Sequence, residues 1–112
     1  MTEITDEYMR EDLGRAREYA LVLLHPGEHY RRDGRDEIVW EHGRRNFSLR
    51  ADGVMPIVGP IPDDSDLVGV CVLDAPLHRA AEIMDGDPSI REGIFVYEIH
   101  PLRSFPGDAL PG

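Results

Sequence analysis

The order of apolar segments predicts an α+β fold of the ferredoxin-like type, β-α-β-β-α-β, with an antiparallel four-stranded sheet covered by two helices. Four short apolar segments have the length of strands, and two longer segments repeat apolar residues at helical spacing. The helices leave one sheet face bare, and a small domain buries such a face by pairing two copies across a two-fold axis. We therefore expect a homodimer.

The composition indicates one acidic domain. The chain has 112 residues, of which 22 are Asp or Glu and 12 are basic, and its formal net charge is −10. This charge repels nucleic-acid backbones and anionic membrane surfaces, so neither is an expected partner. Every basic residue is an arginine, which excludes Schiff-base chemistry because that chemistry needs an amine that can lose its proton.

The single cysteine and the hydropathy pattern predict a cytoplasmic protein. Cys71 lies inside the apolar segment 67–73 and has no second cysteine to pair with, so we expect a buried reduced thiol. No apolar stretch reaches membrane-spanning length, and the acidic N-terminus lacks the character of a signal peptide.

The first elements follow a charged N-terminal extension, residues 1–18, in which Thr5 is placed to cap a helix. Residues 19–24 are almost continuously apolar, which is typical of a buried strand. Residues 25–34 combine Pro, Gly and charged residues and predict a loop at the end of that strand.

A long helix is predicted over residues 35–51. One of its faces carries, at helical spacing, Ile38, Val39, His42, Asn46 and Leu49. His42 therefore faces inward, either as a satisfied core residue or as a group in a pocket. The opposite face carries Trp40 and Phe47, which predicts a covering partner: the N-terminal extension or a second subunit.

The second half of the chain contains the other strands and the second helix. Residues 54–60 predict a strand that Pro56 restricts to an edge or a bulge, and residues 67–73 predict the third strand. Pro76 opens a helix whose apolar stripe is Leu77, Ala80, Ala81 and Met84. Residues 94–100 predict the last strand, and residues 101–112 are expected to be extended or loose.

Asp87-Pro88 forms a rigid corner between the second helix and the last strand, because proline fixes its own φ and restricts the residue before it. Gly93 closes the turn ahead of the strand. Asp87 either presents an acid at this corner or caps the single turn formed by residues 89–92.

Three motifs in order resemble the YCII-related domain family: His42 in the first helix, the Gly59-Pro60 pair, and Asp87-Pro88 followed by Gly93. The resemblance covers residues 19–103, leaving 104–112 as a C-terminal tail. It implies a small ferredoxin-like protein that pairs as a dimeric α+β barrel, with a catalytic His-Asp dyad formed here by His42 and Asp87. One member of the family is a dehydrochlorinase that acts on a chlorinated hydroquinone. This chain departs from the pattern in its N-terminal extension, in Gly43-Arg44-Arg45 and in its long first loop.

A histidine bonded to an aspartate through one ring nitrogen keeps the other nitrogen as a general base near neutral pH. The chain has no Gly-x-Ser-x-Gly elbow, phosphate-binding glycine loop or dinucleotide fingerprint, so acyl and phosphoryl transfer have no sequence support. The remaining reaction class is cofactor-independent proton transfer, such as elimination, dehydrochlorination or isomerisation of a small cyclic or aromatic substrate. The alternative is a non-catalytic dimeric protein that binds a small ligand.

Further residues are expected around the substrate, namely His25, Arg45, Asn46, Gly59, Pro60, Pro88 and Tyr97. A metal site would have to gather His25, His29, His42 and Asp87. Pro26-Gly27 prevents a helical pairing of the first two histidines, so neither a metal nor another cofactor is predicted.

Overall fold

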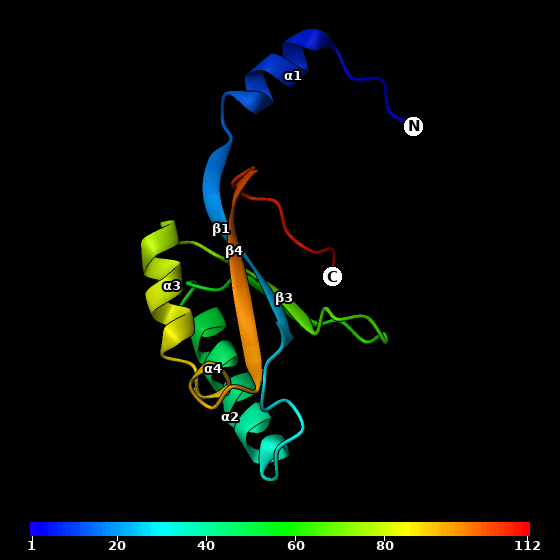
Figure 1. Cartoon of the computed structure of the whole chain (residues 1–112). Coiled ribbons are helices and arrows are strands. Elements are labelled where there is room, and N and C mark those ends of the chain that lie inside the picture. Colours follow the sequence, from blue (N-terminus) through cyan, green and yellow to red (C-terminus); the bar gives the residue numbers. More distant parts are fainter.

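The computed structural model describes all 112 residues and is organised around an antiparallel sheet of four strands in the order β2-β3-β1-β4 (Figure 1). The strands are β1 (Arg17–Pro26), β2 (Ile57–Pro60), β3 (Gly69–Leu73) and β4 (Phe95–Ser104). The helices are α1 (Asp6–Leu13), α2 (Arg35–Ala51), α3 (Leu77–Asp85) and the single turn α4 (Pro88–Arg91). The predicted α+β, ferredoxin-like topology is confirmed.

The core lies between the helices and one face of the sheet. In β1 the buried residues alternate with partly exposed ones, and those buried are Ala20, Val22 and Leu24. Successive side chains of a strand point to opposite faces, so these three point toward the helices, and Cys71 and Leu73 of β3 join them. Figure 1 shows α2, α3 and α4 together at one side of the strands. The opposite face has no helix over it.

The inward face of α2 is the predicted one, but its two buried residues are polar. They are His42 and Asn46, while Ile38, Val39 and Leu49 pack against the core from the edges of the stripe. A helix that buries two polar side chains needs partners for them, because an unpaired buried polar group costs about 1–3 kcal/mol. These partners define the candidate site described below.

The outer face of α2 is uncovered in the single chain. Trp40 and Phe47 are 68% and 64% exposed. The helix α1 does not cover them: it buries no residue and projects beyond the end of the sheet at which β1 begins (Figure 1). None of the helices has the length and apolar character needed to cross a bilayer.

The strands differ from the prediction at their ends. β4 continues through Ser104, so the segment 101–104, expected to be extended or loose, belongs to the sheet. Pro101 is tolerated there because β4 is an edge strand, where one side of the ladder needs no donor. β2 is the other edge strand, as Pro56 predicted, but it begins only after that proline.

Candidate active site

The polar residues of α2 meet the loop before α4 in a buried histidine–aspartate pair. Nδ1 of His42 lies 2.8 Å from Oδ2 of Asp87, whose side chain is completely buried. An ionised carboxylate can only accept hydrogen bonds, so the proton of this bond sits on Nδ1. In the neutral imidazole, Nε2 then carries the lone pair.

The backbone around Asp87 holds its carboxylate in place. Asp87 is the N-cap of α4, and its Oδ1 accepts hydrogen bonds from the backbone N–H of Ser89 at 2.8 Å and from the Ser89 hydroxyl at 2.6 Å. Pro88 is the first helical residue, where its missing N–H costs nothing. Both interpretations of this corner are therefore met, because the same carboxylate caps the turn and faces His42.

These contacts keep Asp87 ionised. Burial acts to raise the pKa of Asp87, but the hydrogen bonds from His42 and Ser89 outweigh burial and lower the pKa below its ordinary value. Nη1 of Arg45 lies 3.8 Å from Oδ2 and adds a positive charge on the same side. The nearby thiol of Cys71 responds in the opposite sense: burial, together with the charge of Asp87, raises its pKa to about 12.

The second ring nitrogen of His42 faces the carboxamide of Asn46, one helical turn further along α2. Nδ2 of Asn46 lies 3.2 Å from Nε2, a distance at which the amide donates to the lone pair of the neutral imidazole. Oδ1 of Asn46 is buried and has no hydrogen-bond partner. A 180° turn of the carboxamide, which exchanges Nδ2 and Oδ1, would place this acceptor opposite a proton on Nε2.

The pair opens onto a cavity with a volume of about 1160 Å³. His42 and Asn46 contribute to its wall from α2, and Gly59 and Pro60 contribute from the edge strand β2. The hollow continues past β2 to the C-terminal tail, where Phe105 lines it. Apolar side chains make up much of the surface around His42, including Leu24, Val39, Val58 and Val68.

The structure brings four of the residues predicted for the site to one cavity, and Asp87 lies behind one of them, His42. His42, Asn46, Gly59 and Pro60 line the cavity. The remaining predicted residues lie outside it: His25, Arg45, Pro88 and Tyr97. Tyr97 points instead toward α3, where its hydroxyl donates to Asp85 at 2.5 Å and its pKa rises to about 12, chiefly through burial.

His25 lies on the bare face of the sheet, opposite to His42. Its Nε2 is 2.6 Å from Oε1 of Glu98, and the other oxygen of Glu98 is 2.7 Å from Nε2 of His100. Of the histidines considered for a metal, His25 and His42 therefore lie on opposite faces of the sheet, and His29 lies in the loop after β1. No group of three or more His, Cys, Asp or Glu side chains is arranged to bind a metal ion.

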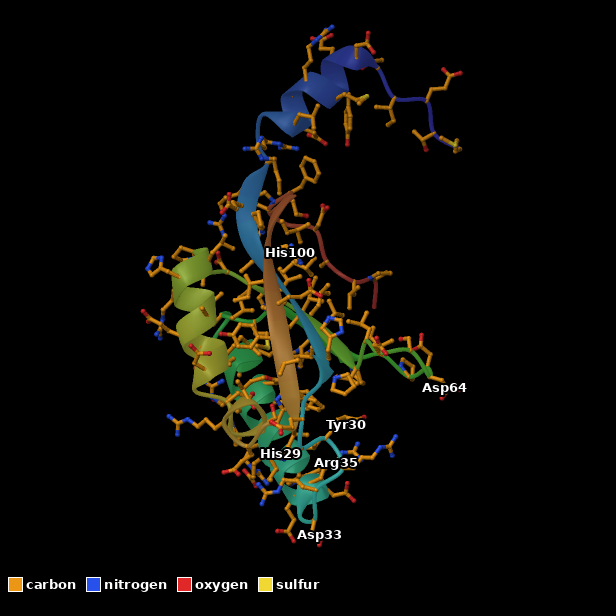
Figure 2. All side chains as sticks on the ribbon, viewed as in Figure 1. His29, Tyr30, Asp33, Arg35, Asp64 and His100 are labelled. Atoms are coloured by element: carbon orange, nitrogen blue, oxygen red, sulfur yellow. The ribbon has the colours of Figure 1, made fainter.

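Four residues that contribute to the site were not predicted: Ser89, Phe95, Tyr30 and Arg35. Ser89 had a local signal, because a residue two positions after an aspartate N-cap commonly donates to it. Phe95 packs edge-on against the His42 ring at 5.2 Å between centroids. Tyr30 and Arg35 come from the loop after β1 and the start of α2, and Figure 2 shows them beside each other, with His100 far along β4.

The fold is thus a split β-α-β-β-α-β domain. It contains a buried histidine–aspartate pair, formed between its first long helix and the corner that precedes its last strand. The family model of the YCII-related domain matches residues 15–103, and the chain belongs to that family. The sequence matches none of the curated proteins with which it was compared.

Proposed function

We propose that this protein is a small cofactor-independent enzyme that moves a proton on a cyclic or aromatic substrate, with His42 as the general acid and base. The observation that supports this most strongly is the 2.8 Å contact between His42 Nδ1 and the ionised Asp87 at the wall of the cavity. Asp87 holds the proton on Nδ1 and stabilises the imidazolium that forms when Nε2 takes a second proton. Elimination, including dehydrochlorination, and isomerisation both begin with the transfer of a proton from the substrate to such a base.

The cavity provides the other requirement of proton abstraction, which is a site that displaces water from the substrate. Its wall near His42 is largely apolar, and Phe95 fixes one side of the imidazole ring. A substrate that enters has to displace the Asn46 amide from Nε2, and the carboxamide then turns toward a substrate oxygen.

The same amide favours a second candidate function. Because Asn46 already donates to the lone pair of Nε2, a protein in which this contact persists would bind a small ligand without converting it. Such a non-catalytic binding or accessory protein would use the His42–Asp87 pair to hold the fold and the wall of the cavity.

The test is proton exchange, which needs no knowledge of the net reaction. The protein is incubated in D₂O with a panel of cyclic ketones, phenols and unsaturated lactones, and deuterium incorporation is followed by proton NMR. We expect the wild type to catalyse exchange and His42→Gln to lower the rate by about 100-fold or more. His78→Gln, which changes an exposed histidine of α3, is the matched control and should exchange at the wild-type rate. Panel members that bind without exchanging would instead support the binding protein.

We also propose that two copies pair through the bare face of the sheet. On that face Leu21 and Leu23 of β1 and Val70 and Val72 of β3 are apolar and only partly buried, and Val96 of β4 is 50% exposed. A sheet face of this kind is stable in water when another layer covers it.

A further inference from the structure

Arg35 lies on the same stripe of α2 as the candidate catalytic histidine. Arg35, Val39, His42 and Asn46 follow one another at helical spacing, and all four line the cavity. Residues seven positions apart on a helix are about 10 Å apart along its axis. One helix therefore presents to the cavity a cation, an apolar spacer and a histidine, in that order.

Arg35 has no acidic partner in a protein that is rich in acids. None of its nitrogens lies within 4.0 Å of a carboxylate, although the chain contains 22 Asp and Glu residues. Its Nε is buried without a hydrogen-bond partner, and its one side-chain hydrogen bond, to the Tyr30 hydroxyl, is long at 3.4 Å. The other partly buried arginine, Arg45, is placed against Asp87. A half-buried guanidinium with an open donor is a binding group for an anion.

A row of aromatic rings connects Arg35 to His42. The guanidinium lies 4.4 Å above the ring of Tyr30, the Tyr30 and Phe95 centroids are 6.0 Å apart, and Phe95 meets His42 at 5.2 Å. Figure 2 shows Tyr30 and Arg35 beside each other at the start of α2. Stacking on Tyr30 fixes the guanidinium, and a flat substrate finds ring faces along the whole distance from the cation to the histidine.

The charge along this wall suits an anion. The acidic residues that line the cavity are Asp74 and Asp108, both far along the chain from α2, and Arg17 already neutralises Asp74 at 2.6 Å. No carboxylate lines the wall between Arg35 and His42, since Asp87 is completely buried behind the imidazole.

We infer that the site takes a flat ring substrate that carries a carboxylate, which Arg35 binds while a ring carbon faces His42. This inference rests on the proposed function for its chemical step. The C–H bond of a ring carbon beside a ring carbonyl breaks, its proton goes to Nε2 of His42, and the electron pair stays on the substrate as the enolate of that carbonyl. The pair then expels a leaving group such as chloride, or takes the proton back at another carbon. No oxidant, reductant or second substrate is needed.

The experiment compares two probes of the same shape, benzoate and benzamide, in NMR titrations of the whole protein. We expect benzoate to shift the resonances of Tyr30, Val39 and His42 and to bind at least about tenfold more tightly than benzamide. Arg35→Gln should weaken benzoate binding about tenfold or more and leave benzamide binding unchanged, whereas Arg35→Lys should retain part of the preference. Arg44→Gln, which changes an exposed arginine on the outer side of α2, is the matched control and should behave as the wild type.

Equal binding of the two probes, no binding of benzoate, or unchanged benzoate binding by Arg35→Gln would overturn the inference. The amide spectrum of each variant shows whether the variant folds. If Arg35→Gln does not fold, Arg35→Lys is compared with the wild type in its place. Because binding is measured without turnover, the two proposals fail separately. If benzoate binds at Arg35 but neither the panel nor any ring carboxylate exchanges, the proposed enzyme is ruled out. If exchange occurs and Arg35→Gln leaves its rate unchanged, the role of Arg35 is ruled out.

Discussion

Asp87 combines three roles in one side chain: it caps α4, accepts from the Ser89 hydroxyl and accepts from His42. In Asp87→Asn the cap can persist, because asparagine is a good N-cap, but the charge that holds the imidazole is lost. We expect the free energy of unfolding at neutral pH to fall by about 2–3 kcal/mol, in the range for buried hydrogen bonds to a charged group. Urea unfolding followed by circular dichroism measures the change.

The pH dependence of this difference has a definite sign. The folded protein lowers the pKa of Asp87, so the stabilisation by its carboxylate is complete above the ordinary value of 3.8 and is lost as the pH falls through the lower folded value. The stability gap between wild type and Asp87→Asn should therefore narrow from about pH 5 to about pH 2. Asp108→Asn, in the exposed tail, is the control, and its free energy of unfolding should equal that of the wild type at every pH. A gap that stayed constant would mean that the charge of Asp87 adds nothing.

The residues of the site differ in how far the sequence predicts them. His42 and Asn46 follow from helical spacing, and Asp87 follows from the rigid Asp-Pro corner. His25 does not, because the apolar run of β1 hides which side chains face the helices; once Leu24 is known to be buried, alternation puts His25 on the other face. Arg35 contacts Tyr30 because of the conformation of the charged loop between β1 and α2. No periodic pattern in the sequence predicts the conformation of that loop.

At the scale of elements, the helices and strands of the domain pack against one another, whereas α1 packs against none of them. Its N-cap hydrogen bond, which the backbone N–H of Tyr8 donates to the Thr5 hydroxyl, is local, and none of its residues is buried. A helix of 8 residues without packing is marginal in water. The pattern of residues 1–18 shows that a helix can form but contains nothing that fixes where it packs.

We therefore predict that deleting residues 1–14 leaves the free energy of unfolding unchanged to within about 0.5 kcal/mol. Deleting residues 101–112 is the contrasting change and should destabilise the fold, because Pro101 to Ser104 pair with Arg17 to Ala20 in the sheet. Thermal and urea unfolding of the two truncated proteins measure the difference. A loss of stability on removal of residues 1–14 would show that α1 packs on a second copy, for which Trp40 and Phe47 of α2 offer an exposed apolar surface.

At the scale of the whole molecule, two apolar surfaces compete as the place where copies meet. One is the bare sheet face, which carries Leu23 between Val70 and Glu98 of the neighbouring strands. The other is the outer face of α2 with Trp40 and Phe47. On the sheet face, hydrogen bonds from His100 and His25 lower the pKa of Glu98, and the hydrogen bond to Glu98 raises the pKa of His25.

Because His25 and His100 already form hydrogen bonds to Glu98 within this face, covering the face does not leave these three polar side chains without partners. We predict that the 12.7 kDa chain sediments as a dimer of about twice that mass. Leu23→Glu should shift it to the monomer, since a carboxylate placed beside Glu98 cannot be buried. Trp40→Glu should leave the dimer intact, and analytical ultracentrifugation over a range of concentrations distinguishes the two. Dissociation by Trp40→Glu but not by Leu23→Glu would move the interface to α2 and leave the sheet face open to another partner.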